Sequence, residues 1–263
     1  MTIDTESVRD GLARGEFFLE YLPTIALADG RCIGAEALIR WRRGGVVVEP
    51  MAFIPIAENT PLSGLISYWV IDTVAAELRD WLKAHPDARV AINIPPEIIG
   101  RGGIAYAATR SGLVDVAPQV VFELTERGLP DAIGIEAIKS GIRQRGVRVA
   151  LDDVTLDGAA NVALLARGSF DVVKLDRHLI AQIDAEHPHP PWLDELAALA
   201  RLPRLEIVAE GVETAQQLQA LRSAGVRSAQ GFYFSRPLAA ADFFAFHRRF
   251  ADGAADPGAP AGA

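Results

Sequence analysis

Short apolar segments alternate with longer amphipathic segments along most of the chain. The short ones are typical of buried strands and lie at 17–22, 33–39, 89–94, 119–124, 147–152, 171–175, 205–209 and 226–231. The longer ones repeat apolar residues at helical spacing and lie at 64–84, 130–145, 157–167, 192–200, 214–224 and 239–249. Strands that alternate with helices in this number predict an α/β fold, a (β/α)₈ barrel. A doubly wound open sheet is the alternative, because periodicity does not show whether a sheet closes.

Turn and cap residues refine this prediction. Only a short turn at Asp29-Gly30 separates the first two strands, which predicts an antiparallel hairpin and an irregular start to the barrel. Thr214 and Asp157 are suited to begin helices, whereas Gly146 and Gly225 are suited to end them.

Segments rich in proline and glycine mark the expected limits of the folded part. We find no linker between residues 16 and 250, so residues 1–250 are predicted to form a single domain. Residues 251–263 contain only Ala, Gly, Pro and Asp and are predicted to be a disordered tail. The histidine- and proline-rich segment 184–191 is predicted to be a surface loop, and His85, which precedes a proline, is also expected at the surface.

Composition excludes several classes of function. The chain has 26 basic against 34 acidic residues, a net charge of −8, which argues against a polymeric nucleic acid as partner. The single cysteine, Cys32, excludes a disulfide framework. No apolar segment is long enough to span a membrane and no signal peptide is evident, so we expect a cytoplasmic protein that does not bind membranes.

Polar residues recur at the ends of the predicted strands. They are Glu36, Asn93, Glu123, Asp152, Asp153, Lys174, Glu210 and Gln230. Any one of them alone is more often a cap or an ion-pair partner. In a barrel, however, the carboxyl ends of the strands meet at one mouth, so these residues are expected to become neighbours. Carboxylates with one amide oxygen and no His or Cys match Mg²⁺ or Mn²⁺ better than Zn²⁺.

Several motifs together resemble those of a known family. Residues 34–41, Gly-Ala-Glu-Ala-Leu-Ile-Arg-Trp, are similar to the signature of EAL domains, the bacterial phosphodiesterases of cyclic di-GMP. Further similar motifs follow in family order at 53–58, 123–126, 152–153, 174–176, 209–214 and 230–232. The resemblance implies a modified TIM-like barrel with an antiparallel first strand, and hydrolysis of cyclic di-GMP to linear pGpG.

The resemblance also implies residue roles and partners. Glu36, Asn93, Glu123 and Asp152 would hold a first metal ion and Asp153 a second, both Mg²⁺ or Mn²⁺. Lys174 would orient the attacking water, Glu210 would act as metal ligand or general base, and Gln230 would support it. Arg40 and Leu38 would contact the substrate, and Glu126 would anchor the loop after Asp153. A homodimer is also implied.

The loop after the Asp-Asp pair departs from the family pattern. Residues 154–161 read Val-Thr-Leu-Asp-Gly-Ala-Ala-Asn, with fewer glycines and one residue more than the usual loop. Glycine permits backbone conformations that β-branched residues avoid, so we expect weaker support for the second metal and low activity. Asp157 would either add an oxygen ligand, which favours Mn²⁺, or cap the next helix. The alternative function is a weak or inactive EAL domain that binds cyclic di-GMP or an unidentified regulatory protein.

Overall fold

The computed structural model describes residues 2–125, 130–138, 143–156, 170–201 and 205–251. Its strands are β1 (Phe17–Ala26), β2 (Cys32–Arg43), β3 (Val46–Val48), β4 (Arg89–Asn93), β5 (Val120–Thr125), β6 (Arg148–Val154), β7 (Val172–Leu175), β8 (Glu206–Ala209) and β9 (Ser228–Ala229). They pair in the order β1-β9-β8-β7-β6-β5-β4-β2-β3, and β1 also pairs with β2. This extra pairing closes the sheet, so the predicted barrel is confirmed and the open-sheet alternative is wrong.

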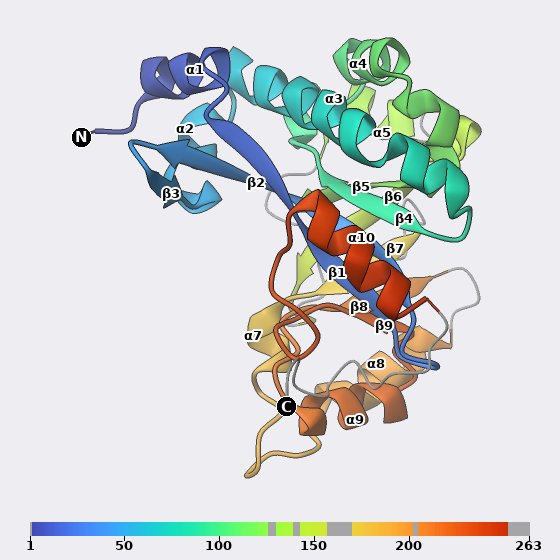
Figure 1. Cartoon of the computed structure of the whole chain (residues 1–263). Coiled ribbons are helices and arrows are strands. Elements are labelled where there is room, and N and C mark those ends of the chain that lie inside the picture. The colour runs from blue at the N-terminus through green and yellow to red at the C-terminus, as the bar shows by residue number, and fades with distance from the viewer. Residues whose placement is uncertain (1, 126–129, 139–142, 157–169, 202–204, 252–263) are drawn as a thin grey trace.

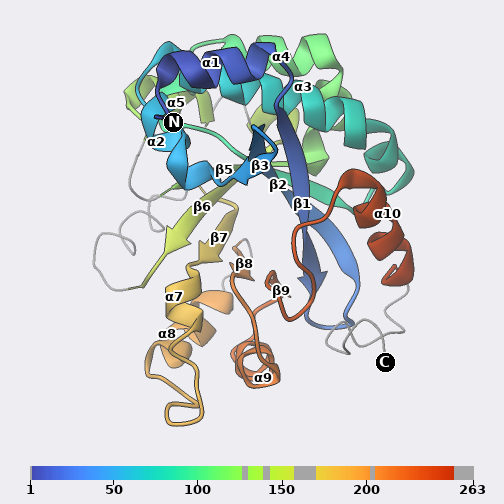
Figure 2. The ribbon, with the colours of Figure 1, turned by 60° about the vertical axis from the view of Figure 1, so that its left-hand side comes forward.

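The hairpin at the start of the barrel is also confirmed. Strand β1 is antiparallel to both of its neighbours, β2 and β9, whereas β2 and β4 to β9 pair in parallel. Gly30 adopts a left-handed φ of 74° in the connecting turn, a conformation that glycine takes readily. Strand β3 extends β2 outside the closed ring (Figure 2).

Helices surround this barrel (Figure 1). They are α1 (Thr5–Ala13), α2 (Ile54–Ala57), α3 (Pro61–Ala84), α4 (Gly103–Ser111), α5 (Ala132–Ala137), α7 (Arg177–Ile180), α8 (Trp192–Ala200), α9 (Ala215–Ser223) and α10 (Ala240–Arg249). Short 3₁₀ helices cover Pro50–Ala52, Pro96–Ile98, Leu113–Gln119 and Arg143–Arg145. None of the helices in the described ranges is long and apolar enough to span a bilayer.

Local sequence explains where several helices begin and end. The Thr214 side chain accepts a hydrogen bond from the Gln217 backbone and caps α9, as predicted, and Gly225 follows this helix with a φ of 82°. The pattern did not predict α1 or α4, which are short and bury only two residues each. The predicted helix at 157–167, its cap Asp157 and most of the tail lie outside the described residues.

His85 is more enclosed than the expected surface position implies. His85 is half-buried where the end of α3 packs against α10, and its Nδ1 lies 2.8 Å from the Trp81 carbonyl oxygen. Its ring is 4.7 Å from that of His247, which is buried and also packs on Trp81. His187 and His189 are exposed, as expected for the proline-rich loop.

This histidine pair predicts a pH dependence of stability. Burial and the neighbouring His85 lower the pKa of His247 from its ordinary 6.5. The folded chain therefore binds fewer protons there than the unfolded chain, and stability falls as pH drops below about 6.5. We expect His247→Phe to flatten this part of the pH profile, measured by urea unfolding between pH 5 and 8. His187→Phe, at an exposed histidine, is the control and should leave the profile unchanged.

Candidate active site

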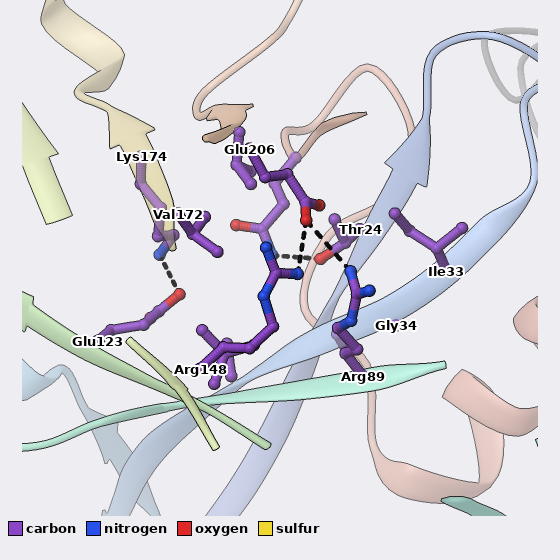
Figure 3. A pocket seen from close by; sticks show the side chains of 14 residues that line it. Thr24, Ile33, Gly34, Arg89, Glu123, Arg148, Val172, Lys174 and Glu206 are labelled. Carbon is purple, nitrogen blue, oxygen red and sulfur yellow. Dashed lines mark hydrogen bonds and ion pairs between the residues drawn. The ribbon is translucent and has the colours of Figure 1, made fainter. Parts of the chain in front are cut away.

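A buried lysine lies at the centre of the candidate site. The Lys174 Nζ atom is 2.5 Å from Glu210 Oε1, 2.8 Å from Glu123 Oε1, 3.0 Å from Glu36 Oε2 and 3.4 Å from Asp152 Oδ1. Its side chain is only 3% exposed. Five side chains from five strands or strand ends therefore meet inside the barrel. Figure 3 shows the Lys174–Glu123 pair from within.

Strand register brings these side chains together. Asn93 on β4 lies opposite Glu123 on β5, and Asp152 on β6 lies two positions further along β5, opposite Thr125. Asn93 Nδ2 then donates to Glu36 Oε1 at 2.9 Å. Because parallel strands present their carboxyl ends at the same side of a barrel, these residues become neighbours despite their distance in sequence.

The charges in this cluster do not balance. Four carboxyl groups contact one ammonium, so full ionisation would leave a net charge of −4 + 1 = −3. Burial opposes the charged form of Lys174, but the surrounding carboxylates dominate and raise the lysine pKa well above its usual range. Burial and the nearby carboxylates raise the pKa of Glu123, and burial with Asp152 and Glu36 raises that of Glu210, despite Lys174. Both raised pKa values indicate that the cluster contains too little positive charge to keep all of its carboxyl groups ionised.

Glu36 differs from these two carboxyl groups. Burial raises its pKa, but Lys174 and the Asn93 amide outweigh that effect, so the pKa of Glu36 is lowered. Its two oxygens have separate partners, Asn93 for Oε1 and Lys174 for Oε2. Glu36 is therefore the carboxylate that the protein itself neutralises best.

Two observations fit a divalent cation. Asp152, Asp153 and Glu210 each offer an oxygen, and these atoms lie within 4.8 Å of one another. Glu123 is 2% exposed, and its Oε2 has no hydrogen-bond partner. An all-oxygen donor set with an excess of negative charge matches Mg²⁺ or Mn²⁺. The carboxylate oxygens of this site are therefore suited to bind Mg²⁺ or Mn²⁺.

Asp153 has an unusual backbone. Its φ is 58°, in the left-handed region, and its N–H donates to Asp152 Oδ1 at 2.9 Å. This conformation turns the chain sharply after the Asp152 position, where the ladder between β6 and β7 also shifts register. Aspartate tolerates the conformation better than most residues do. Of the predicted loop, only residues up to 156 are described.

Other predicted residues make their polar or strand contacts outside the lysine cluster. The Arg40 guanidinium is paired with Glu20 at 2.9 Å and with Glu49 at 3.6 Å. Leu38 is half-buried on β2, opposite Glu20 of β1. The Gln230 amide nitrogen donates to Thr24 Oγ1 at 2.9 Å, which ties it to β1. Glu126, the predicted loop anchor, lies outside the described residues.

The sequence reasoning missed a second charged layer inside the barrel. Glu206 Oε2 accepts hydrogen bonds from Arg148 at 2.6 Å and from Arg89 at 3.2 Å, as Figure 3 shows. Each of these residues is the first of its strand, so this layer lies at the end of the barrel opposite the lysine cluster. Charged residues at three strand starts were the signal that could have revealed it.

Comparison with known proteins agrees with this architecture. The family model for the EAL domain matches residues 5–237. The chain belongs to the EAL domain family. The phosphodiesterase MucR of Pseudomonas aeruginosa, solved as a cyclic di-GMP complex, superposes with a TM-score of 0.78 at 29% identity, covering 90% of this chain and 98% of that one. The predicted family and its barrel are therefore confirmed.

Curated relatives of this EAL domain are longer proteins. The probable cyclic di-GMP phosphodiesterase PdeB of Escherichia coli is 30% identical over 239 residues, which cover 90% of this chain and 45% of PdeB. The cyclic di-GMP phosphodiesterase NbdA of Pseudomonas aeruginosa is 34% identical, covering 96% of this chain and 33% of NbdA. The chain thus spans less than half the length of these relatives.

Proposed function

We propose that this EAL domain hydrolyses cyclic di-GMP to linear pGpG with the aid of Mg²⁺ or Mn²⁺. The observation that carries this proposal is the buried cluster of four carboxyl groups around Lys174. Its members occupy the positions of the EAL motifs, and relatives at about 30% identity are named as cyclic di-GMP phosphodiesterases. The predicted homodimer, regulatory partner and cytoplasmic location stay predictions.

The residues divide into holders of metal and residues that act on the phosphodiester. Glu36, Asn93, Glu123, Asp152 and Asp153 would hold two ions, because each of these side chains offers an oxygen of the kind that such ions bind. When bound, divalent ions neutralise the anionic substrate and lower the pKa of bound water. The orphaned Glu123 Oε2 supports a place for such an ion.

Lys174 and Glu210 are suited to the chemical step. The lysine carries a proton at neutral pH because its carboxylate partners raise its pKa, so it supplies a fixed positive charge for the phosphoryl oxygens. Glu210 is 22% exposed, the most open carboxyl group on Lys174, and would take a proton from the attacking water. A water oxygen bonds to phosphorus, the bond from phosphorus to the 3′ oxygen breaks, and that oxygen leaves with a proton.

The predicted substrate contacts already have partners within the protein. Arg40 donates from Nε to Glu20 at 2.9 Å and from Nη1 to the Ile39 carbonyl oxygen at 3.0 Å, and its guanidinium carries further N–H groups that suit a phosphate. Gln230 acts through its position beside β1, since its amide nitrogen is already used there. We therefore assign Arg40 and Leu38 to substrate binding and Gln230 to support of the site.

A product assay tests this proposal. The purified chain is incubated with cyclic di-GMP and Mg²⁺ or Mn²⁺, with EDTA as the control, and products are separated by chromatography. We expect linear pGpG to form only with metal. Recovery of bound but uncleaved cyclic di-GMP would support the regulatory alternative instead, and neither binding nor cleavage would contradict both functions.

A substitution at Asp153 tests the second metal position. Asn tolerates the left-handed backbone of this residue but removes its negative charge. We expect Asp153→Asn to leave the thermal midpoint nearly unchanged and to raise the metal concentration for half-maximal activity about 10- to 100-fold. Calorimetric titration with Mn²⁺ measures the affinity directly. Wild-type affinity and activity in this variant would remove Asp153 from the metal site.

A further inference from the structure

A small cavity lies inside the barrel between the two charged layers. Its volume is about 50 Å³. Lys174 and Glu123 line it on the side of the active site, and Arg89, Arg148 and Glu206 line the opposite side (Figure 3). Gln230 also lines the cavity. Valine and alanine side chains form the walls between these polar ends.

Small residues create this space. In TIM barrels, bulky branched side chains usually fill the interior in layers. Here Gly34, Ala35 and Ala91 line the cavity instead. A Cβ atom added at Gly34 would meet the Arg89 carbonyl oxygen at 2.1 Å, so the close approach of β2 and β4 excludes a larger residue there.

One polar atom at the cavity wall lacks a partner. Gln230 is only 2% exposed, and its Oε1 has no hydrogen bond from the protein. Its Nε2 donates to Thr24 Oγ1 at 2.9 Å and to the Leu22 carbonyl oxygen at 3.4 Å, which fixes the orientation of the amide. A buried acceptor left without a donor is unfavourable, so this oxygen requires a donor that the protein does not supply.

We propose that the cavity is a binding site for ordered water, and that one of these molecules donates a hydrogen bond to Gln230 Oε1. A cavity needs about 10–15 Å³ to hold one water, so a volume of about 50 Å³ has room for ordered water. Arg148, Glu206 and the Thr24 hydroxyl offer further partners. The Arg89 side chain at the far end is 42% exposed, so this end of the cavity lies near solvent and away from the active site.

The water site has a consequence for Gln230. Without water, this amide would gain by turning its oxygen toward the Thr24 hydroxyl, which can also donate, and it would then lose its hydrogen bond to the Leu22 carbonyl oxygen. Bound water keeps the Gln230 amide in this orientation. Gln230 is then a positioning residue that is itself held by water inside the barrel. This inference concerns hydration and stands whether or not the chain hydrolyses cyclic di-GMP.

Filling the cavity distinguishes a wet interior from a dry one. Ala91→Val and Val208→Ile each add carbon atoms at the wall. In a dry cavity they would stabilise the protein. In the hydrated cavity they displace water from Gln230, and we expect the thermal midpoint to fall by about 2–4 °C for each. Val173→Ile, on the same sheet but outside the cavity lining, controls for crowding within the strands.

A second background isolates the role of Gln230. In Gln230→Leu the orphaned oxygen is gone, so Val208→Ile should no longer lower the midpoint. These measurements use metal-free protein and do not depend on activity. A crystal structure at better than about 2 Å should show water within hydrogen-bond distance of Gln230 Oε1. A higher midpoint for Val208→Ile in the wild-type background, or a cavity without water density, would overturn the proposal.

Discussion

Lys174→Met is expected to destabilise the metal-free protein by about 3–5 kcal/mol, the cost of removing one partner from a buried ion pair. Methionine fills nearly the same volume but carries no charge. Four carboxyl groups, three of them buried, would then face one another without the ammonium that lies 2.5–3.4 Å from each of them. Urea unfolding in EDTA measures this loss.

The resemblance to EAL domains implies a role of Lys174 in the reaction rate. The structure indicates that Lys174 also stabilises the fold. Lys83→Met is the matched control, because Lys83 is 47% exposed and pairs with Asp115 on the surface at 3.1 Å. We expect it to change the unfolding free energy by less than about 1 kcal/mol. Equal effects of the two variants would contradict the account of Lys174 as the central cation of the cluster.

Divalent cations should reduce the penalty in Lys174→Met. An ion among the same carboxylates restores part of the lost positive charge, so added Mg²⁺ or Mn²⁺ is expected to stabilise this variant more than the wild type. Activity should stay low in the same samples, because the metal does not replace the charge that we propose Lys174 supplies to the phosphoryl group. The two readouts separate the stability role of Lys174 from its catalytic one.

The sequence pattern was sufficient for the strands because each one is a short apolar segment between turn signals, whereas closure of the sheet into a barrel does not follow from periodicity. Segment 192–200 was predicted to the residue as α8, and Thr214 begins α9 as its hydroxyl suggested. The antiparallel hairpin followed from the shortness of the Asp29-Gly30 turn. By contrast, α1 and α4 bury little, and this leaves a weak periodic signal.

The members of the candidate site were predictable, but their partners were not. Strand ends converge in any barrel, so polar residues there predict a cluster. The hydrogen-bond or ion-pair partner of each side chain depends on which neighbouring strands that side chain can reach. Arg40 follows the EAL signature, yet its guanidinium pairs with Glu20, which no motif marks. Gln230 likewise bonds to Thr24 on the antiparallel strand. Such contacts follow from register and cannot be derived from spacing within one segment.

Charge balance is a further property that the sequence left open. The sequence alone gives no reason to expect that removing one carboxylate of the cluster affects stability differently from removing another. The structure separates them, since Lys174 and Asn93 satisfy both oxygens of Glu36, whereas Glu123 Oε2 has no partner. Neutralising Glu123 therefore relieves electrostatic repulsion in the cluster. Neutralising Glu36 instead removes a charge that Lys174 and Asn93 already stabilise.

Glu123→Gln is accordingly expected to abolish metal-dependent hydrolysis without loss of metal-free stability. The amide resembles the protonated carboxyl group that burial and neighbouring charges favour at this position. We expect the unfolding free energy to stay close to the wild-type value, because the amide is neutral like the protonated carboxyl group. As a lost metal ligand, however, it should lower the hydrolysis rate by more than about 100-fold at fixed Mn²⁺.

Glu36→Gln provides the comparison within the same cluster. It removes the same charge, but from the carboxylate whose ionised form Lys174 and Asn93 stabilise. We therefore expect a similar loss of hydrolysis together with a loss of about 1–3 kcal/mol in metal-free stability, the range for breaking hydrogen bonds to a buried charged group. Unfolding in EDTA and product formation in Mn²⁺ are measured on both variants. Equal stabilities would show that the two carboxyl groups share the lysine evenly, and retained activity in either variant would remove that residue from the proposed metal site.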